Sequence, residues 1–210
     1  MMSQKKYKDC FEKLYSLFTE AYLTFYVWKG LQEKEFEQIF RENNNFWSAI
    51  LFALENTWLT SLAKLYEESN YSKRSTIISV YSLVPHQADA MRGKQARDSL
   101  KQHEGTIQNV RILRNNQLAH NNTEHLLNPK NILRKYPIKY TQVEELMEIS
   151  VYLLSYLHPD TGHGYSFEGF AEGCQRDAKS MITKLEYFSK KKAEHRDKFL
   201  RGEVHSPQFP

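Results

Sequence analysis

The sequence from residue 46 to residue 68 reads FWSAILFALENTWLTSLAKLYEE, and this stretch says most about the fold. Large apolar side chains recur along it at steps of three and four residues, which is the spacing of one face of an α-helix. This face comprises Trp47, Ile50, Leu51, Leu54, Trp58, Leu62, Leu65 and Tyr66. We therefore expect residues 46–68 to form the longest and most buried helix of the chain.

The same periodicity predicts further helices on both sides of this segment. They cover residues 11–26 (with an aromatic inner face), 76–83, 105–122, 141–157 and 170–200. Residues 90–104 are polar and basic, and they fit either an exposed helix or a mobile loop. The pattern predicts an all-α bundle of about five or six helices.

Specific residues are expected to begin and end these helices. Pro85 should stop the helix over 76–83, because proline lacks the backbone N–H that a helix interior needs. Thr141, followed three residues later by Glu144, forms the pattern of a capping box. Pro159 should end the helix that Thr141 begins.

Composition indicates one folded domain over residues 1–200 and a disordered tail over 201–210. Among the 210 residues, 40% are hydrophobic and 26% charged, as is usual for soluble globular proteins. No apolar run approaches the roughly 20 residues of a membrane span, and the N-terminus lacks the apolar core of a secretory signal. Cys10 and Cys174 offer neither a disulfide framework nor a paired metal motif. We expect a cytosolic protein with no cofactor and no membrane partner.

Positive charge is concentrated in the middle of the chain. Residues 71–139 contain 12 Lys and Arg against 4 Asp and Glu, whereas residues 1–70 and 140–210 each carry a small negative excess. A local basic surplus favours a polyanionic partner, because neutralised phosphates release their counterions. Solvation of exposed loops by the same side chains is an equally good interpretation of this feature alone.

Residues 110–122, with the sequence VRILRNNQLAHNN, carry the residues best suited to chemistry. Arg114 is a permanent cation, Asn115 a polar neighbour and His120 a base that titrates near neutrality. Six residues rotate an α-helix by about 240°, so Arg114 and His120 do not share a face of a regular helix. Their side chains can meet if His120 lies at a frayed helix end. Asn116 and His120 are four residues apart and do share a face.

An arginine, a polar residue and a histidine near the end of a helix in an all-α bundle resemble the HEPN superfamily (higher eukaryotes and prokaryotes nucleotide-binding domains). The form Arg-Asn-Asn-Gln-Leu-Ala-His over residues 114–120 looks most like the AbiU-type branch, a bacterial abortive-infection group. The resemblance spans most of residues 10–190, and outside the motif it rests on the helix pattern.

This resemblance implies a HEPN-like helical bundle that cleaves RNA without a metal. His120 would be the general acid or base, Arg114 would stabilise the charge on the phosphate, and Asn115 would orient one of them. Further RNA contacts are expected from Arg111, Asn116, Lys130, Arg134 and Lys135. Family members pair two motif helices in a homodimer, and some act in antiphage or toxin–antitoxin defence, so an antitoxin is a second expected partner.

Other roles are open for these residues. Arg114 could form a structural ion pair, and His120 could simply stabilise a helix C-terminus. The whole chain could be a non-catalytic module that binds RNA or a protein partner, or a bundle that binds a small molecule. His158, His163 and Asp160 could bind a metal, but no third ligand lies at helical spacing.

Overall fold

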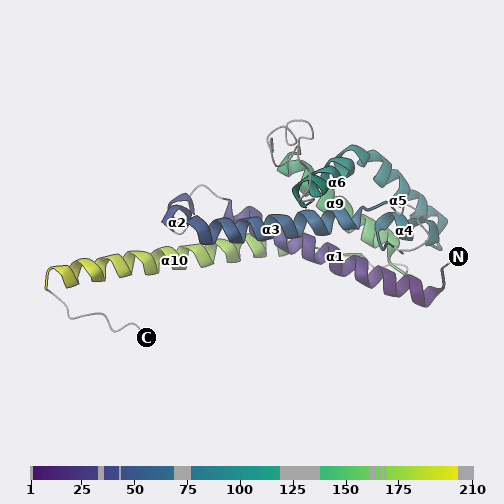
Figure 1. Cartoon of the computed structure of the whole chain (residues 1–210). Coiled ribbons are helices and arrows are strands. Elements are labelled where there is room, and N and C mark those ends of the chain that lie inside the picture. The colour runs from purple at the N-terminus through teal and green to yellow at the C-terminus, as the bar shows by residue number, and fades with distance from the viewer. Residues whose placement is uncertain are drawn as a thin grey trace.

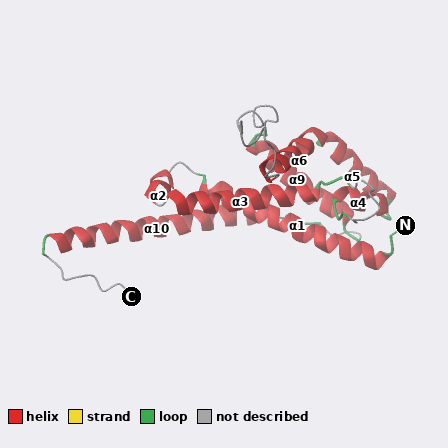
Figure 2. Ribbon diagram, in the orientation of Figure 1, coloured by secondary structure: helices red, strands yellow, loops and turns green. Residues whose placement is uncertain are grey.

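The structure is a computed structural model that describes residues 2–32, 36–42, 44–68, 77–118, 138–160, 164–165, 167 and 169–202. Over these residues the protein is all-α, as predicted, with eight α-helices and no strand (Figures 1 and 2). The helices are α1 (Gln4–Leu31), α2 (Glu37–Glu42), α3 (Asn44–Leu65), α4 (Val80–Leu83), α5 (Ala90–Gln102), α6 (Glu104–Leu118), α9 (Tyr140–Leu157) and α10 (Phe170–Leu200). The number exceeds the expected five or six because α2 is a separate short helix and because residues 90–102 are helical.

α1, rather than α3, supplies the largest share of the core among the described helices. It has 28 residues against 22 for α3, and α10 is longer still with 31, so the expectation that α3 is the longest and most buried helix was wrong. The aromatic face expected on residues 11–26 is buried, with Phe18 and Phe25 completely inaccessible. In α3, burial is concentrated in the C-terminal half, whereas Phe52 in the other half is 59% exposed.

α10 packs against the end of α1 through a glycine. A Cβ atom added to Gly30 would lie 3.0 Å from the Gln175 Cα and 3.3 Å from the Ala178 Cβ, so any larger residue would force the helices apart. Ala178 and Ile182 are the buried residues of α10. Close approach of backbones at small residues thus fixes the position of its first half.

α5, α6 and α9 form a second group of helices that packs beside α1 and α3 (Figure 1). α5 begins at Asp89, whose side chain accepts hydrogen bonds from the backbone N–H groups of Met91 and Arg92. It buries Gly93, Ala96 and Leu100, and α9 is its main neighbour. The helical alternative for residues 90–104 is therefore confirmed, and its small residues explain the close packing.

Two helices begin at residues other than those expected. α4 begins at Val80 rather than at residue 76, but it ends at Leu83, as expected from Pro85. A 3-10 helix, Val84–His86, follows it directly, with Pro85 in its first turn, where no intrahelical N–H is needed. The helix expected to start at Thr141 begins at Tyr140, and the side chain of Gln142 accepts from the backbone N–H of Lys139 at 2.8 Å. Glu144 instead forms an ion pair with Lys29 of α1. As expected, α9 ends just before Pro159.

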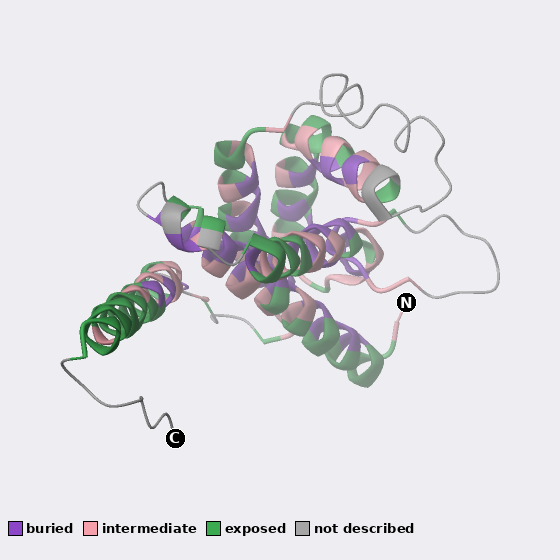
Figure 3. Cartoon of the chain, turned by 60° about the vertical axis from the view of Figure 1, so that its left-hand side comes forward, coloured by how far each residue is buried: buried purple, intermediate pink, exposed green. Residues whose placement is uncertain are grey.

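The second half of α10 extends away from the rest of the molecule (Figures 1 and 3). Its sequence is rich in lysine, and the polar character of residues 190–200 agrees with their exposure. Met181 and Phe188, which belong to the apolar pattern that predicted this helix, are 63% and 67% exposed. The expected single domain over residues 1–200 stays a prediction, and the tail over 203–210 lies outside the described residues.

A buried hydroxyl pair joins α3 to α9 and gives a test of this packing. The Tyr66 hydroxyl donates to the Ser150 Oγ at 2.6 Å, and that Oγ donates to the Leu146 carbonyl at 2.7 Å. Tyr66→Phe should lower the free energy of unfolding by about 1–2 kcal/mol, because a buried polar contact is lost. Urea denaturation would measure this, with Tyr152→Phe, at an exposed position on α9, as the matched control. Equal stability of both variants would contradict the packing.

Candidate functional site

α6 presents one side to the core and the other to solvent. Ile107, Val110 and Leu113 are buried, at the spacing expected for this helix, and they face α3 and α9. Arg114 follows Val110 by four residues and Arg111 follows Ile107 by four, so both arginines start from the edge of the buried side. Their guanidinium groups consequently lie over the end of α3 rather than in open solvent.

Arg114 is held in a partly buried position by a carboxylate. Its side chain is only 19% exposed, and its Nη2 donates to the Glu67 Oε1 at 3.3 Å. Its Nε–H is buried and has no hydrogen-bond partner among the described residues. A buried donor without an acceptor is unfavourable by about 1–3 kcal/mol, so this group would gain from an added acceptor.

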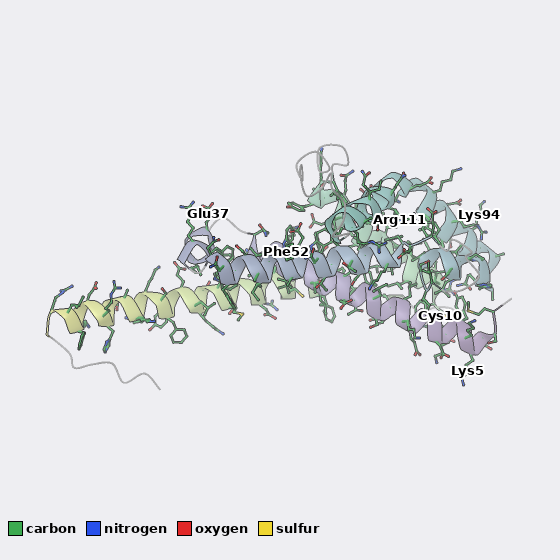
Figure 4. The ribbon with its side chains drawn as sticks, in the orientation of Figure 1. Lys5, Cys10, Glu37, Phe52, Lys94 and Arg111 are labelled. Atoms are coloured by element: carbon green, nitrogen blue, oxygen red, sulfur yellow. The ribbon has the colours of Figure 1, made fainter. Side chains whose placement is uncertain are left out.

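Arg111 forms a second ion pair, with Glu68, the residue that follows Glu67 in the chain. Its Nη1 donates to the Glu68 Oε1 at 2.5 Å, and its side chain is 24% exposed. Figure 4 marks Arg111 on α6 near the end of α3. Because positions three apart on a helix are neighbours, the two arginines form a continuous basic edge held by two adjacent carboxylates.

This arrangement can bind an oxyanion by exchange. A guanidinium has five N–H donors in a planar fork, and the carboxylate of Glu67 uses one of those on Arg114. A phosphate group could accept from the Nε–H, which has no partner among the described residues, together with an Nη. This is the two-point geometry that arginine favours. The structural ion pair considered for Arg114 therefore exists, and it leaves donors for a ligand.

The other expected site residues are less well placed or lie outside the described residues. Asn115 lies on the last turn of α6, where its side chain is exposed to solvent. The structure describes the backbone of Asn116 but not its side chain. Four further site residues lie outside the described residues altogether: His120, Lys130, Arg134 and Lys135. The structure thus brings Arg111 and Arg114 together, and the distance from Arg114 to His120 stays untested.

Glu67 and Glu68 are the site residues that sequence reasoning missed. The sequence does show two adjacent carboxylates at the end of an apolar helical pattern and, much later in the chain, two arginines three residues apart. Nothing in that signal pairs the two segments, because more than 40 residues separate them. His103, which is close to the arginines in the sequence, instead forms hydrogen bonds through its ring with the Ser99 carbonyl and with Glu145.

In the part of the chain that the structure describes, no group of three His, Cys, Asp or Glu side chains could hold a metal ion. His163 lies outside that part. Cys10 and Cys174 are both free thiols. No described helix combines the length and the apolar character that crossing a membrane requires.

Comparison with known proteins identifies the family of the chain. The AbiU2 model of the HEPN domains matches residues 5–178. The chain belongs to the AbiU2 family. No curated protein and no solved structure matches it.

The matched range coincides with the packed part of this AbiU2 domain. It begins in the first turn of α1 and ends at Ala178, one turn before the last buried residue of α10, Ile182. It includes α3 and α6, and therefore both ion pairs. The resemblance to the HEPN superfamily is thus confirmed at the level of the family, while the role of the Arg-Asn-x-x-x-Ala-His motif stays a prediction.

The pairing of Arg114 with Glu67 can be measured directly. In a double-mutant cycle with Arg114→Met and Glu67→Gln, we expect a coupling free energy of about 0.5–1 kcal/mol, limited because Glu67 is partly exposed. The cycle of Arg41→Met and Glu37→Gln is the control, since those side chains are 77% and 70% exposed, and it should show no measurable coupling. No coupling between Arg114 and Glu67 would mean that the ion pair does not form in solution.

Proposed function

We propose that this AbiU2 domain is a metal-independent endoribonuclease of an antiphage or toxin–antitoxin system. The observation that carries the proposal is the partly buried guanidinium of Arg114, whose Nε–H has no hydrogen-bond partner among the described residues. Arg114 lies on α6 and is the first residue of the Arg-Asn-x-x-x-Ala-His sequence. A second cation, Arg111, adjoins it. The basic surplus of residues 71–139 supports a polyanionic substrate.

The proposed reaction is transfer of the phosphoryl group to the neighbouring ribose hydroxyl. The 2′-oxygen attacks phosphorus as it loses its proton, the bond to the 5′-oxygen breaks, and that oxygen receives a proton. The products are a 2′,3′-cyclic phosphate and a 5′-hydroxyl end. His120 acts as the general base or acid in this step, because an imidazole exchanges protons near neutral pH.

Arg114 acts in this mechanism on the charge that develops at phosphorus. Two N–H groups of one guanidinium can contact two phosphate oxygens, and a partly buried site strengthens these contacts relative to water. Binding of RNA would shift Arg114 from the Glu67 carboxylate to the phosphate. Asn115, exposed beside Arg114, orients either the phosphate or His120. Arg111, Asn116, Lys130, Arg134 and Lys135 contact the flanking RNA backbone.

The proposed enzyme is a homodimer. Because six residues rotate a regular helix by about 240°, Arg114 and His120 would not share a face of one helix, and a partner chain could supply the histidine that completes each site. A stable monomer in sedimentation at micromolar concentration would contradict this arrangement. An antitoxin is the second proposed partner.

A different function, binding RNA or a protein without cleavage, has one observation in its favour. Arg114 and Arg111 already have carboxylate partners, and such pairs can be purely structural. The two functions make different products, so an assay of RNA ends separates them.

Incubation of the purified protein with total cellular RNA in excess EDTA tests the proposal. The wild type should produce discrete cuts with 2′,3′-cyclic phosphate ends. His120→Ala should reduce the cleavage rate by about 10²–10⁴-fold, the usual contribution of a general acid or base. His195→Ala, on the exposed half of α10 outside the matched family range, is the control and should cut like the wild type.

Two outcomes would contradict the nuclease. One is retention of cleavage by the His120→Ala protein. The other is RNA binding by the wild type with intact RNA ends, which would favour the binding module.

A further inference from the structure

A pocket of about 330 Å³ opens beside α6, and it has no role in the proposed reaction. It lies between the 3-10 helix and the helices α4, α5 and α6. Its apolar walls come from Tyr81, Val84, Pro85 and Leu100. The ring of Tyr81 and the pyrrolidine of Pro85 offer flat surfaces, which suit a planar ligand.

The polar groups of this pocket divide into cations and carboxylates. Arg97 and Lys101 are one helical turn apart on α5, are exposed, and form no ion pair within the described residues. Glu68 and Glu104 line the same pocket from the end of α3 and the start of α6. The site therefore combines a basic pair suited to a phosphate with carboxylates that accept N–H donors.

The pocket is connected to the candidate catalytic residues. Glu68, which lines it, is the carboxylate that holds Arg111. Burial raises the pKa of Tyr81, and the carboxylate of Glu68 adds to that rise while Arg111 opposes it, so these three groups lie in one electrostatic environment. Along α6, Glu104 precedes Arg111 by about 10 Å of helix axis and Arg114 by about 15 Å.

We propose that this pocket binds an unpaired guanine base of the RNA, within a few nucleotides of the bond that is cut. Guanine places two neighbouring N–H donors, N1–H and N2–H, on one edge, and a single carboxylate can accept both. Glu104 is the carboxylate assigned to this edge, because Glu68 is engaged by Arg111. The base lies against Tyr81, and Lys101 with Arg97 contacts the attached phosphate.

The other bases fit this arrangement less well. Adenine and cytosine place a ring acceptor beside their amino group, and uracil places its N–H between two carbonyl oxygens, so each would set an acceptor against the Glu104 carboxylate. Single-stranded RNA is usually recognised in this manner, with a base stacked on an aromatic ring and bonded along its edge. The pocket would thus give the enzyme a preference for guanine near the cut.

This inference rests on RNA being the ligand, as in the proposed function, but it can be tested without cleavage. Calorimetric titration of the full-length His120→Ala protein with 5′-GMP should show saturable binding, and 5′-AMP should bind at least ten-fold more weakly. Glu104→Gln should lower the GMP affinity at least ten-fold. Lys94→Ala, an exposed change on α5 outside the pocket (Figure 4), should leave it unchanged.

A second variant separates recognition of the base from recognition of the phosphate. Lys101→Ala should weaken binding of 5′-GMP and leave binding of guanosine unchanged. Circular dichroism would verify that the Glu104 and Lys101 variants are folded, as expected for exposed positions.

Three results would overturn the guanine pocket: no binding of GMP, equal binding of GMP and AMP, or full GMP affinity in Glu104→Gln. These results leave the nuclease intact if the wild type cuts RNA. Conversely, guanine-specific binding by a protein that never cuts RNA would retain the pocket and contradict the enzyme.

Discussion

The contact between the end of α3 and the outer edge of α6 is the interaction on which the candidate site depends. Two consecutive carboxylates, Glu67 and Glu68, hold Arg114 and Arg111 at positions where each guanidinium is mostly covered. Without these carboxylates, two half-buried cations would face each other across one helical turn. The same contact stabilises α6 and leaves the Arg114 Nε–H without an acceptor among the described residues.

The rest of the fold serves to fix the end of α3. The aromatic face of α1 covers the C-terminal half of α3, where Leu62, Leu65 and Tyr66 are inaccessible to solvent. Tyr66, the residue directly before the two carboxylates, forms a hydrogen bond with Ser150 of α9. Glu67 and Glu68 therefore directly follow a tightly packed part of the chain, and α6 packs against α3 beside it. The exposed half of α10 lies far from this contact (Figure 1).

The sequence was sufficient to predict those parts of the fold that follow from local pattern. The periodic apolar residues of α1 and α10 and the stop at Pro159 could be read directly, and the motif led to the correct family. The exposure of Phe52 could not be predicted from the sequence, because it depends on which side of α3 the other helices cover. Glu67 and Glu68 were missed for a related reason, since only folding brings them to Arg114 and Arg111. The pocket beside α6 likewise combines residues from four separate segments.

The most direct test of the account is the environment of the Arg114 Nε–H when RNA binds. Its side-chain ¹⁵N–¹H resonance can be followed by NMR while single-stranded RNA is added to the His120→Ala protein, with the exposed Arg176 as reference. The account predicts that the Arg114 signal moves in proportion to the bound RNA as the guanidinium passes from Glu67 to a phosphate, while the Arg176 signal stays in place. RNA binding that shifts other resonances and leaves the Arg114 Nε–H unchanged would contradict it.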